Sequence, residues 1–235
     1  MGRVMRFTIR LTANTETIPY NYYYKLAGIF HAWLGPNELH DLMSLYNVGS
    51  LFDTRVKTGA NGLDFTQGAD WVLGIYNEEI AERLIAGLLL KPFEFYGMRI
   101  QNVKRQEPPK FESSRVYYWA SAPILTRWTA EKGESREHLV YNDPRSTIAL
   151  TNTLKHKADE AGLTQYWKNS SHVAFDDRYP KAKTKLIQVK NTENRANLCP
   201  VIVDAHEKIQ HLSWVVGVGE STGIGFGSLN YARSL

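Results

Sequence analysis

The first half of the chain alternates between segments with a strand-like period of two and segments with a helical period. Residues 5–11 place apolar and polar side chains in alternation, which predicts a strand with one buried face. Residues 19–34 carry apolar side chains at i, i+3, i+4 and i+7. This spacing predicts an amphipathic helix that ends at Gly35 and Pro36.

The remainder of this half continues the pattern. Two short β-rich runs at 51–59 and 70–76 are separated by Gly, Asn and Asp residues, which predicts two antiparallel strands. Asn77 is a suitable N-cap for a helix with an acidic first turn and an apolar face. With a further strand expected over 93–105, the order β-α-β-β-α-β is that of a ferredoxin-like domain.

The second half has a comparable order, so we expect an α+β protein with two tandem ferredoxin-like domains, 1–111 and 112–235. Paired prolines in "EPPKF" mark the linker between them. The expected elements of the second half are a strand in 115–128, a helix over 146–162, a hairpin of 183–190 with 198–205, a short helix over 206–219 and a last strand over 224–234.

Composition agrees with a folded globular protein. Of the 235 residues, 43% are hydrophobic and 22% are charged, which is ordinary for such a chain. The apolar runs are shorter than the ~20 residues of a membrane span, and no signal peptide is recognised, so a cytoplasmic protein without membrane contact is expected. The single cysteine, Cys199, has no partner for an intramolecular disulfide and is expected in the core.

A basic segment lies in the second half. The net charge of the chain is only +4, which permits a polyanionic partner without requiring one. Residues 178–195 nevertheless hold six cations and a single anion, Glu193. Lysines 181, 183 and 185 alternate, so a strand would place them on one face, where they would either track phosphates or form an ordinary solvated surface.

The segment 217–228, "GVGESTGIGFGS", contains five glycines. It lacks the third glycine of the Rossmann G-x-G-x-x-G motif and the Lys-Ser/Thr pair of a P-loop, which excludes both nucleotide motifs. Two interpretations remain: a loop whose bare backbone lets a polyanion approach its N–H groups, or a bulged turn.

Three stretches together resemble a known family. "MRFTIRL" at the start, "IPYNYYYKLAGIFHAWL" in the first helix and "GVGESTGIGFGSLNYA" near the C-terminus are similar to the CRISPR-associated, repeat-processing endoribonucleases of the RAMP superfamily. The resemblance implies two tandem ferredoxin-like folds and a cleft that holds CRISPR repeat RNA. It also implies cleavage without a metal or cofactor. An effector complex and a homodimer are both compatible with it.

Metal-independent RNA cleavage uses the ribose 2′-OH as the nucleophile and leaves a 2′,3′-cyclic phosphate and a 5′-OH. It needs an acid and a base, and a histidine titrating near neutral pH serves as either. His31 is the best candidate, because it lies beside the apolar stripe of the first helix and Gly28 would leave room for a nucleotide. In the family implied by the resemblance, this helix commonly carries a catalytic residue.

The second catalytic group stays open between His40 and Tyr46, with His40 preferred because its side chain titrates nearer pH 7. Lys57 or Arg55 is expected to stabilise the phosphorane. The expected RNA-binding residues are Arg55, Arg178, Lys181, Lys183, Lys185, Lys190, Gly217, Gly219, Ser221, Thr222, Gly223, Gly225 and Gly227.

Two other functions compete with RNA cleavage. One is that of a binding-only member of the same superfamily, which holds a repeat RNA without cutting it. The other is that of a general RNA-binding module with RRM-like sheets, but the aromatic RNP1 pattern of that module is not visible in the expected strands.

Overall fold

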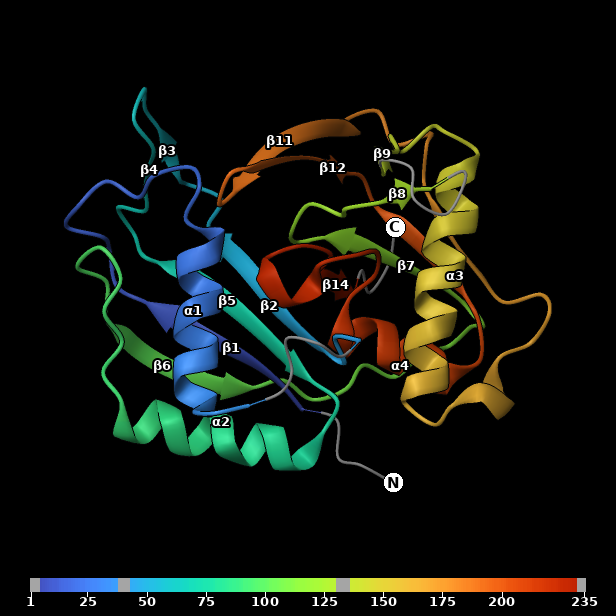
Figure 1. Cartoon of the computed structure of the whole chain (residues 1–235), viewed down its shortest axis with the longest axis horizontal. Helices are drawn as coiled ribbons and strands as arrows, with labels where there is room; N and C mark the ends of the chain where they lie inside the picture. Colours follow the sequence, from blue (N-terminus) through green and yellow to red (C-terminus); the bar gives the residue numbers. More distant parts are fainter. Residues whose placement is uncertain (1–4, 38–42, 130–135, 232–235) are drawn as a thin grey trace.

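The computed structural model describes residues 5–37, 43–129 and 136–231. The first half forms a four-stranded antiparallel sheet in the order β2-β5-β1-β6, with helices on one face (Figure 1). Its elements are β1 (Met5–Leu11), α1 (Tyr23–Leu34), β2 (Tyr46–Phe52), β5 (Ala69–Ile75), α2 (Glu78–Leu90) and β6 (Ile100–Arg105).

Local sequence explains the helices of this half. The buried residues of α1 include Leu26, Phe30 and Trp33, the stripe expected from the helical period. The side chain of Asn77 accepts a hydrogen bond from the Ile80 amide at 3.1 Å and so caps α2 as predicted. Because β1 lies between β5 and β6, its alternating apolar side chains reach the core beneath the helices.

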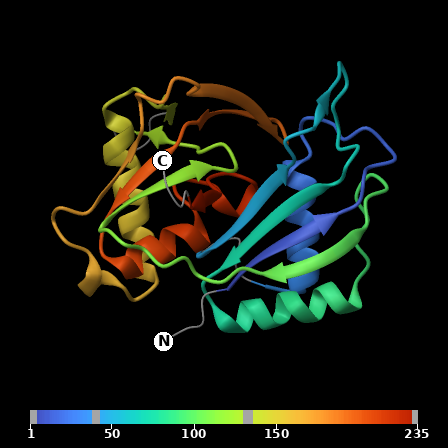
Figure 2. The same ribbon diagram turned by 180° about the vertical axis from the view of Figure 1, so that it is seen from behind.

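The second half repeats this arrangement, with a sheet in the order β10-β13-β7-β14. Figure 2 shows both sheets from behind. Its elements are β7 (Arg115–Ala120), α3 (Arg145–Glu160), β10 (His172–Phe175), β13 (Val201–Asp204), α4 (Glu207–Val216) and β14 (Leu229–Tyr231). Both halves therefore have the ferredoxin-like strand order, which confirms the predicted α+β fold class.

The predicted hairpin of 183–190 with 198–205 is wrong. Strand β11 (Lys183–Val189) pairs with β12 (Thr192–Leu198) in a separate two-stranded sheet, and β13 enters the main sheet. The apolar run is divided at Pro200, which has no N–H to donate to a continuing ladder. The second strand of this ferredoxin-like unit is β10, which has no counterpart among the strands expected from the sequence.

Other strand boundaries also differ from the expected ones. The run expected as one strand over 51–59 is the end of β2, a turn, and a strand of a small hairpin; the run in 115–128 likewise divides into β7 and a short second strand. The remaining short elements are β3 (Lys57–Thr58), β4 (Leu63–Asp64), β8 (Arg127–Trp128), β9 (Glu137–His138) and the 3-10 helices η1 (Thr164–Tyr166) and η2 (Thr222–Ile224).

Arg6 of β1 joins the two halves. Its guanidinium is buried, donates to the backbone carbonyls of Trp214 and Leu229, and donates to Oδ1 of Asn230 at 3.1 Å. Burial lowers the pKa of Arg6 to about 9. These contacts hold the C-terminal segment against the first sheet, and so bring the glycine-rich segment near α1.

The boundary predicted at 111/112 lies in the connection between the last strand of the first sheet and the first strand of the second, and it remains a prediction. None of the helices in the described ranges has the length and apolar character needed to cross a lipid bilayer.

Candidate functional site

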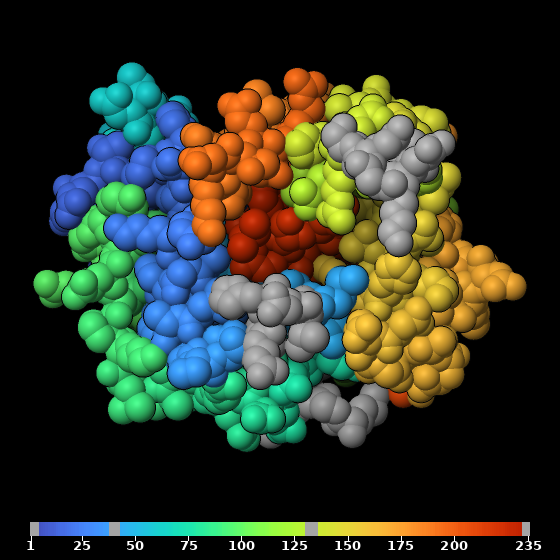
Figure 3. Space-filling view, viewed as in Figure 1, coloured from blue at the N-terminus to red at the C-terminus, as the bar shows by residue number. Residues whose placement is uncertain are grey.

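A pocket of about 900 Å³ lies between α1 and the glycine-rich segment. Figure 3 shows the red C-terminal segment at the bottom of a hollow bordered by blue α1 and the orange β11–β12 hairpin. The lining residues come from four parts of the chain: Tyr24, Lys25, Ala27, Gly28, Ile29, His31 and Ala32; Ser44 and Tyr46; Val189 and Lys190; Ser221, Gly223 and Ile224.

His31 and Tyr46 meet in this pocket. Their ring centroids are 6.0 Å apart and the rings are nearly perpendicular, at 87°. Gly28 lies one helical turn before His31, and a methyl group added to it would have no heavy atom within 4 Å. Gly28 therefore leaves open space on α1 in the pocket that His31 also lines, and the catalytic role of His31 stays a prediction.

Tyr46 itself is almost fully buried at the start of β2. Burial raises the pKa of its phenol, and the neighbouring Ser44 lowers it by a smaller amount. The hydroxyl is therefore protonated at neutral pH, in which state it donates a proton more readily than it accepts one.

Two lysines line the pocket. Lys25 Nζ lies 4.0 Å from the ring centre of Tyr96, and Lys190 Nζ lies 4.4 Å from that of Tyr24. Lys190 belongs to the turn of the β11–β12 hairpin, which carries a cation from the second half to a helix of the first. Among the described residues that line this pocket, none is Asp or Glu, so the local charge favours an anion.

The glycines shape the loop through packing. Gly225 has φ +108°, and a Cβ there would overlap the Tyr23 ring; at Gly227, with φ +70°, it would overlap the Val218 carbonyl. Gly217 and Gly219 are likewise buried. The sides of these four glycines that lack a side chain therefore pack against protein. This packing is a structural reason for glycine at these positions, separate from the RNA contact expected from the sequence. Ser221 and Gly223 line the pocket.

Thr222 also points inward. Its side chain is buried, donates to the Tyr46 carbonyl at 3.1 Å, and accepts from Lys157 Nζ at 3.1 Å. Asn47 Nδ2 donates to the Phe226 carbonyl at 2.9 Å, which fixes β2 to the other end of the same loop. The RNA contact predicted for Thr222 therefore has no exposed side chain to make it.

The predicted phosphate-stabilising cations lie elsewhere. Lys57 is exposed in the small β3–β4 hairpin and Arg55 in the turn before it, where Arg55 pairs with Asp53 at 3.9 Å. Neither lines the pocket, because the chain turns after Phe52 and does not continue β2. His40 lies outside the described residues.

The basic segment is exposed, which both interpretations of it, phosphate tracking and an ordinary solvated surface, require. Arg178 and Lys181 precede β11, and Lys183 and Lys185 lie on the same face of that strand. Although the Lys185 side chain is exposed, the surrounding protein partly desolvates its ammonium and lowers its pKa, and the charge of Lys183 adds a smaller lowering. Because Lys181 precedes β11, this strand carries only two of the three lysines predicted to lie in a row, Lys183 and Lys185. Lys190 follows at the hairpin turn.

Sequence reasoning did not select Lys25, Tyr24 or Lys157. Lys25 lies one helical turn before Gly28, the position already singled out for its open space, so a signal was present. Lys157 falls on the buried stripe of α3 together with Leu150 and Leu154, and a lysine in that position is unusual. The stripe alone does not indicate which segment of the chain Lys157 contacts.

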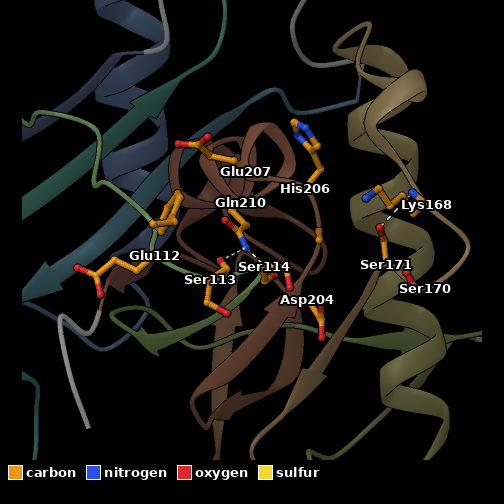
Figure 4. A pocket seen from close by; sticks show the side chains of 12 residues that line it. Glu112, Ser113, Ser114, Lys168, Ser170, Ser171, Asp204, His206, Glu207 and Gln210 are labelled. Atoms are coloured by element: carbon orange, nitrogen blue, oxygen red, sulfur yellow. Dashed lines mark hydrogen bonds between the residues drawn. The ribbon is translucent and has the colours of Figure 1, made fainter.

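A separate pocket of about 410 Å³ lies near the start of α4 (Figure 4). Gln210 Nε2 donates there to the carbonyls of Ser113 and Ser114, at 3.0 and 2.6 Å. Its lining carboxylates, Glu112, Asp204 and Glu207, outnumber its one lysine, Lys168. This pocket therefore suits a polyanion less well than the one beside His31.

The fold of the chain is similar to that of several solved structures. A solved structure described as a characterization of a Cas6-related gene from Pyrococcus furiosus has a TM-score of 0.84 and 18% identity, with 99% of this chain and 100% of that chain covered. A RAMP protein binding different RNA substrates has a TM-score of 0.83 and 17% identity, with 97% and 100% covered. A Cas6 product complex has a TM-score of 0.66 and 16% identity, with 99% and 100% covered.

These likenesses establish the fold. No curated protein matches the sequence. The family profile "CRISPR associated protein Cas6, C-terminal" matches residues 106–231, which is more than half of the chain and includes the glycine-rich loop. The chain therefore belongs to the CRISPR-associated Cas6 family of RAMP proteins.

Proposed function

We propose that this protein binds CRISPR repeat RNA and cuts the precursor transcript by metal-independent transesterification. The observation that carries the proposal is the shared pocket of His31 and the glycine-rich loop, with Lys25 and Lys190 at its wall. An acid–base side chain, open space and positive charge are what the reaction needs at a single phosphodiester. The family assignment supports repeat RNA as the substrate.

In the proposed reaction the ribose 2′ oxygen forms a bond to phosphorus and the bond from phosphorus to the 5′ oxygen breaks. One proton leaves the 2′-OH and another is added to the 5′ oxygen, giving a 2′,3′-cyclic phosphate and a 5′-OH. His31 supplies one of these transfers. Lys25 and Lys190 stabilise the additional negative charge on the phosphorane.

The second proton transfer is assigned to Tyr46, which lies against His31, with His40 retained as the alternative. Lys57, Arg55, Arg178, Lys181, Lys183 and Lys185 are proposed to contact RNA outside the pocket, as expected of exposed cations.

The test is cleavage of an end-labelled repeat RNA in EDTA. The wild-type protein is compared with His31→Ala, and the normal RNA with one that carries a single 2′-deoxy sugar at the cut site. We expect cleavage only by wild type on normal RNA, with a 2′,3′-cyclic phosphate end. His172→Ala, a histidine outside this pocket, is the matched control and should cleave normally.

Cleavage that requires magnesium, or that survives both the His31 change and the deoxy substitution, would contradict this mechanism. The second candidate function, RNA binding without cutting, is favoured only by the burial of Tyr46, which restricts its access to substrate. It predicts tight binding of the repeat RNA and an uncut product lane for wild type.

A further inference from the structure

A second pocket of about 420 Å³ lies on the α3 side of the glycine-rich loop. Ser44 and Ser221 line both this pocket and the one that contains His31. The two pockets are therefore neighbours that share these two small side chains as a wall. A strand that crossed Ser221 would therefore pass from the first pocket into the second.

The second pocket is lined by basic side chains. They are Arg136, His156 of α3 and the buried Lys157, whose ammonium already contacts three protein acceptors; the one carboxylate in the lining is Glu220. Glu220 Oε2 is bound by Arg127 Nη2 at 2.8 Å and by Arg136 Nη1 at 3.2 Å, so two guanidiniums compensate its charge.

Arg136 keeps donors for a ligand. Its side chain is 61% exposed, and its ion pair with Glu220 uses one end of a group that has five N–H donors. His156 is exposed on the same pocket wall, and the hydroxyl of Thr129 adds a neutral donor; the hydroxyl of Thr153 donates to the Ala149 carbonyl within α3. Cations and hydroxyls around a small hollow are the groups that bind a phosphate oxygen.

We propose that this pocket is a second RNA subsite, which holds a phosphate of the same strand one or more nucleotides away from the bond at His31. The proposal rests on the proposed function, because the ligand is the repeat RNA. Arg136 and His156 bind the phosphate, and Ser221 lies between the two subsites. The subsite thereby fixes which phosphodiester lies beside His31.

The experiment measures binding rather than cleavage. A fluorescent repeat RNA with a 2′-deoxy sugar at the cut site is titrated with wild type and with Arg136→Ala/His156→Ala, over a range of salt concentrations. We expect the double variant to bind about tenfold more weakly. Because the variant no longer neutralises one phosphate of a single strand, the slope of its salt dependence should fall by about 0.7. Arg115→Ala/His172→Ala, outside both pockets, is the control and should bind as wild type does.

Two shortened RNAs locate the bound phosphate. One ends on the 5′ side of the cut and the other begins on its 3′ side. The double variant should differ from wild type with only one of them, because only one contains the phosphate in the second pocket. Equal decreases in affinity with both RNAs, or no decrease with the full repeat, would overturn the subsite.

A third variant separates direct binding from charge compensation. If Arg136 serves only to neutralise Glu220, then Arg136→Ala/Glu220→Gln will recover wild-type affinity, and the proposed phosphate binding by Arg136 is wrong. We expect the affinity of this variant to remain below that of wild type.

Failure of the wild-type protein to bind any repeat RNA would contradict both the proposed function and the subsite. Normal binding by wild type together with an unchanged affinity of Arg136→Ala/His156→Ala would contradict only the subsite.

Discussion

The ammonium group of Lys157 in α3 lies 3.1 Å from the hydroxyl of Thr222 in the glycine-rich loop. It is also within 3.4 and 3.5 Å of the carbonyls of Val216 and Gly217. Three acceptors match the three N–H donors of a charged lysine. Thr222 in turn donates to the carbonyl of Tyr46, so one lysine connects α3, the loop and the strand that carries Tyr46.

Lys157 makes stability depend on pH. Burial lowers its pKa from 10.5 to about 7, although the charge of Glu220 acts in the opposite direction. Between these two values the unfolded chain binds more protons at this position than the folded protein. The free energy of unfolding should therefore rise as pH increases from about 7 to 10.5, and fall on return toward 7.

The measurement is urea unfolding at several pH values in this range, with wild type, Lys157→Met and Lys155→Met. Methionine keeps the length of the side chain without a titratable group. Lys155 lies on the same helix in a partly exposed pair with Asp159, so its variant should keep the wild-type slope. An unchanged slope in Lys157→Met would show that another group causes the pH dependence.

The sequence predicts those structural features that depend on residues close together in the chain, and it misses those that depend on contacts between distant segments. The alternating pattern of β1 and the stripe of α1 are local, and the sequence predicts both. The sequence places the start of β2 at 51 instead of Tyr46, because α1, α4 and η2 pack against this strand outside the sheet and six of its seven residues are buried. A strand buried on both faces has no period of two to detect.

The same distinction applies to the candidate site. His31 and Gly28 share a face of one helix, so their juxtaposition follows from residue spacing. The meeting of Lys190 with Tyr24 depends on how the hairpin of one half crosses to the helix of the other, and no local pattern contains that information. A position of Lys57 near His31 would require the strand to continue through a segment that instead turns.

Alanine substitutions at Gly28 and Gly225 should change the free energy of unfolding in opposite directions. Gly28 has helical surroundings and open space, so Gly28→Ala should raise the free energy of unfolding by about 0.5–1 kcal/mol. Gly225→Ala should lower it by about 2 kcal/mol or more, because a Cβ would overlap the Tyr23 ring at a positive φ. Denaturant unfolding of both variants checks this, and equal effects would contradict the packing role of Gly225.

Lys190 should contribute to RNA affinity through charge. We expect Lys190→Ala to weaken binding of an uncleavable repeat RNA, with the salt slope reduced by about 0.7. Lys168→Ala, in the acidic pocket near α4, is the matched control and should leave both quantities unchanged. Equal decreases in affinity in the two variants would indicate a nonspecific effect of net charge.

Tyr46 and His40 compete for the second catalytic role; among the described residues, Tyr46 has its ring 6.0 Å from that of His31. Tyr46→Phe removes only a hydroxyl, so folding and RNA affinity should change little. If the phenol transfers a proton, the single-turnover cleavage rate should fall by about 10²-fold or more. Because burial raises the pKa of this phenol, it acts as the acid, and the alkaline decline of wild-type activity should lie above the usual range of tyrosine. A Tyr46→Phe variant that cleaves at the wild-type rate, beside a His40→Ala variant that does not cleave, would assign the role to His40.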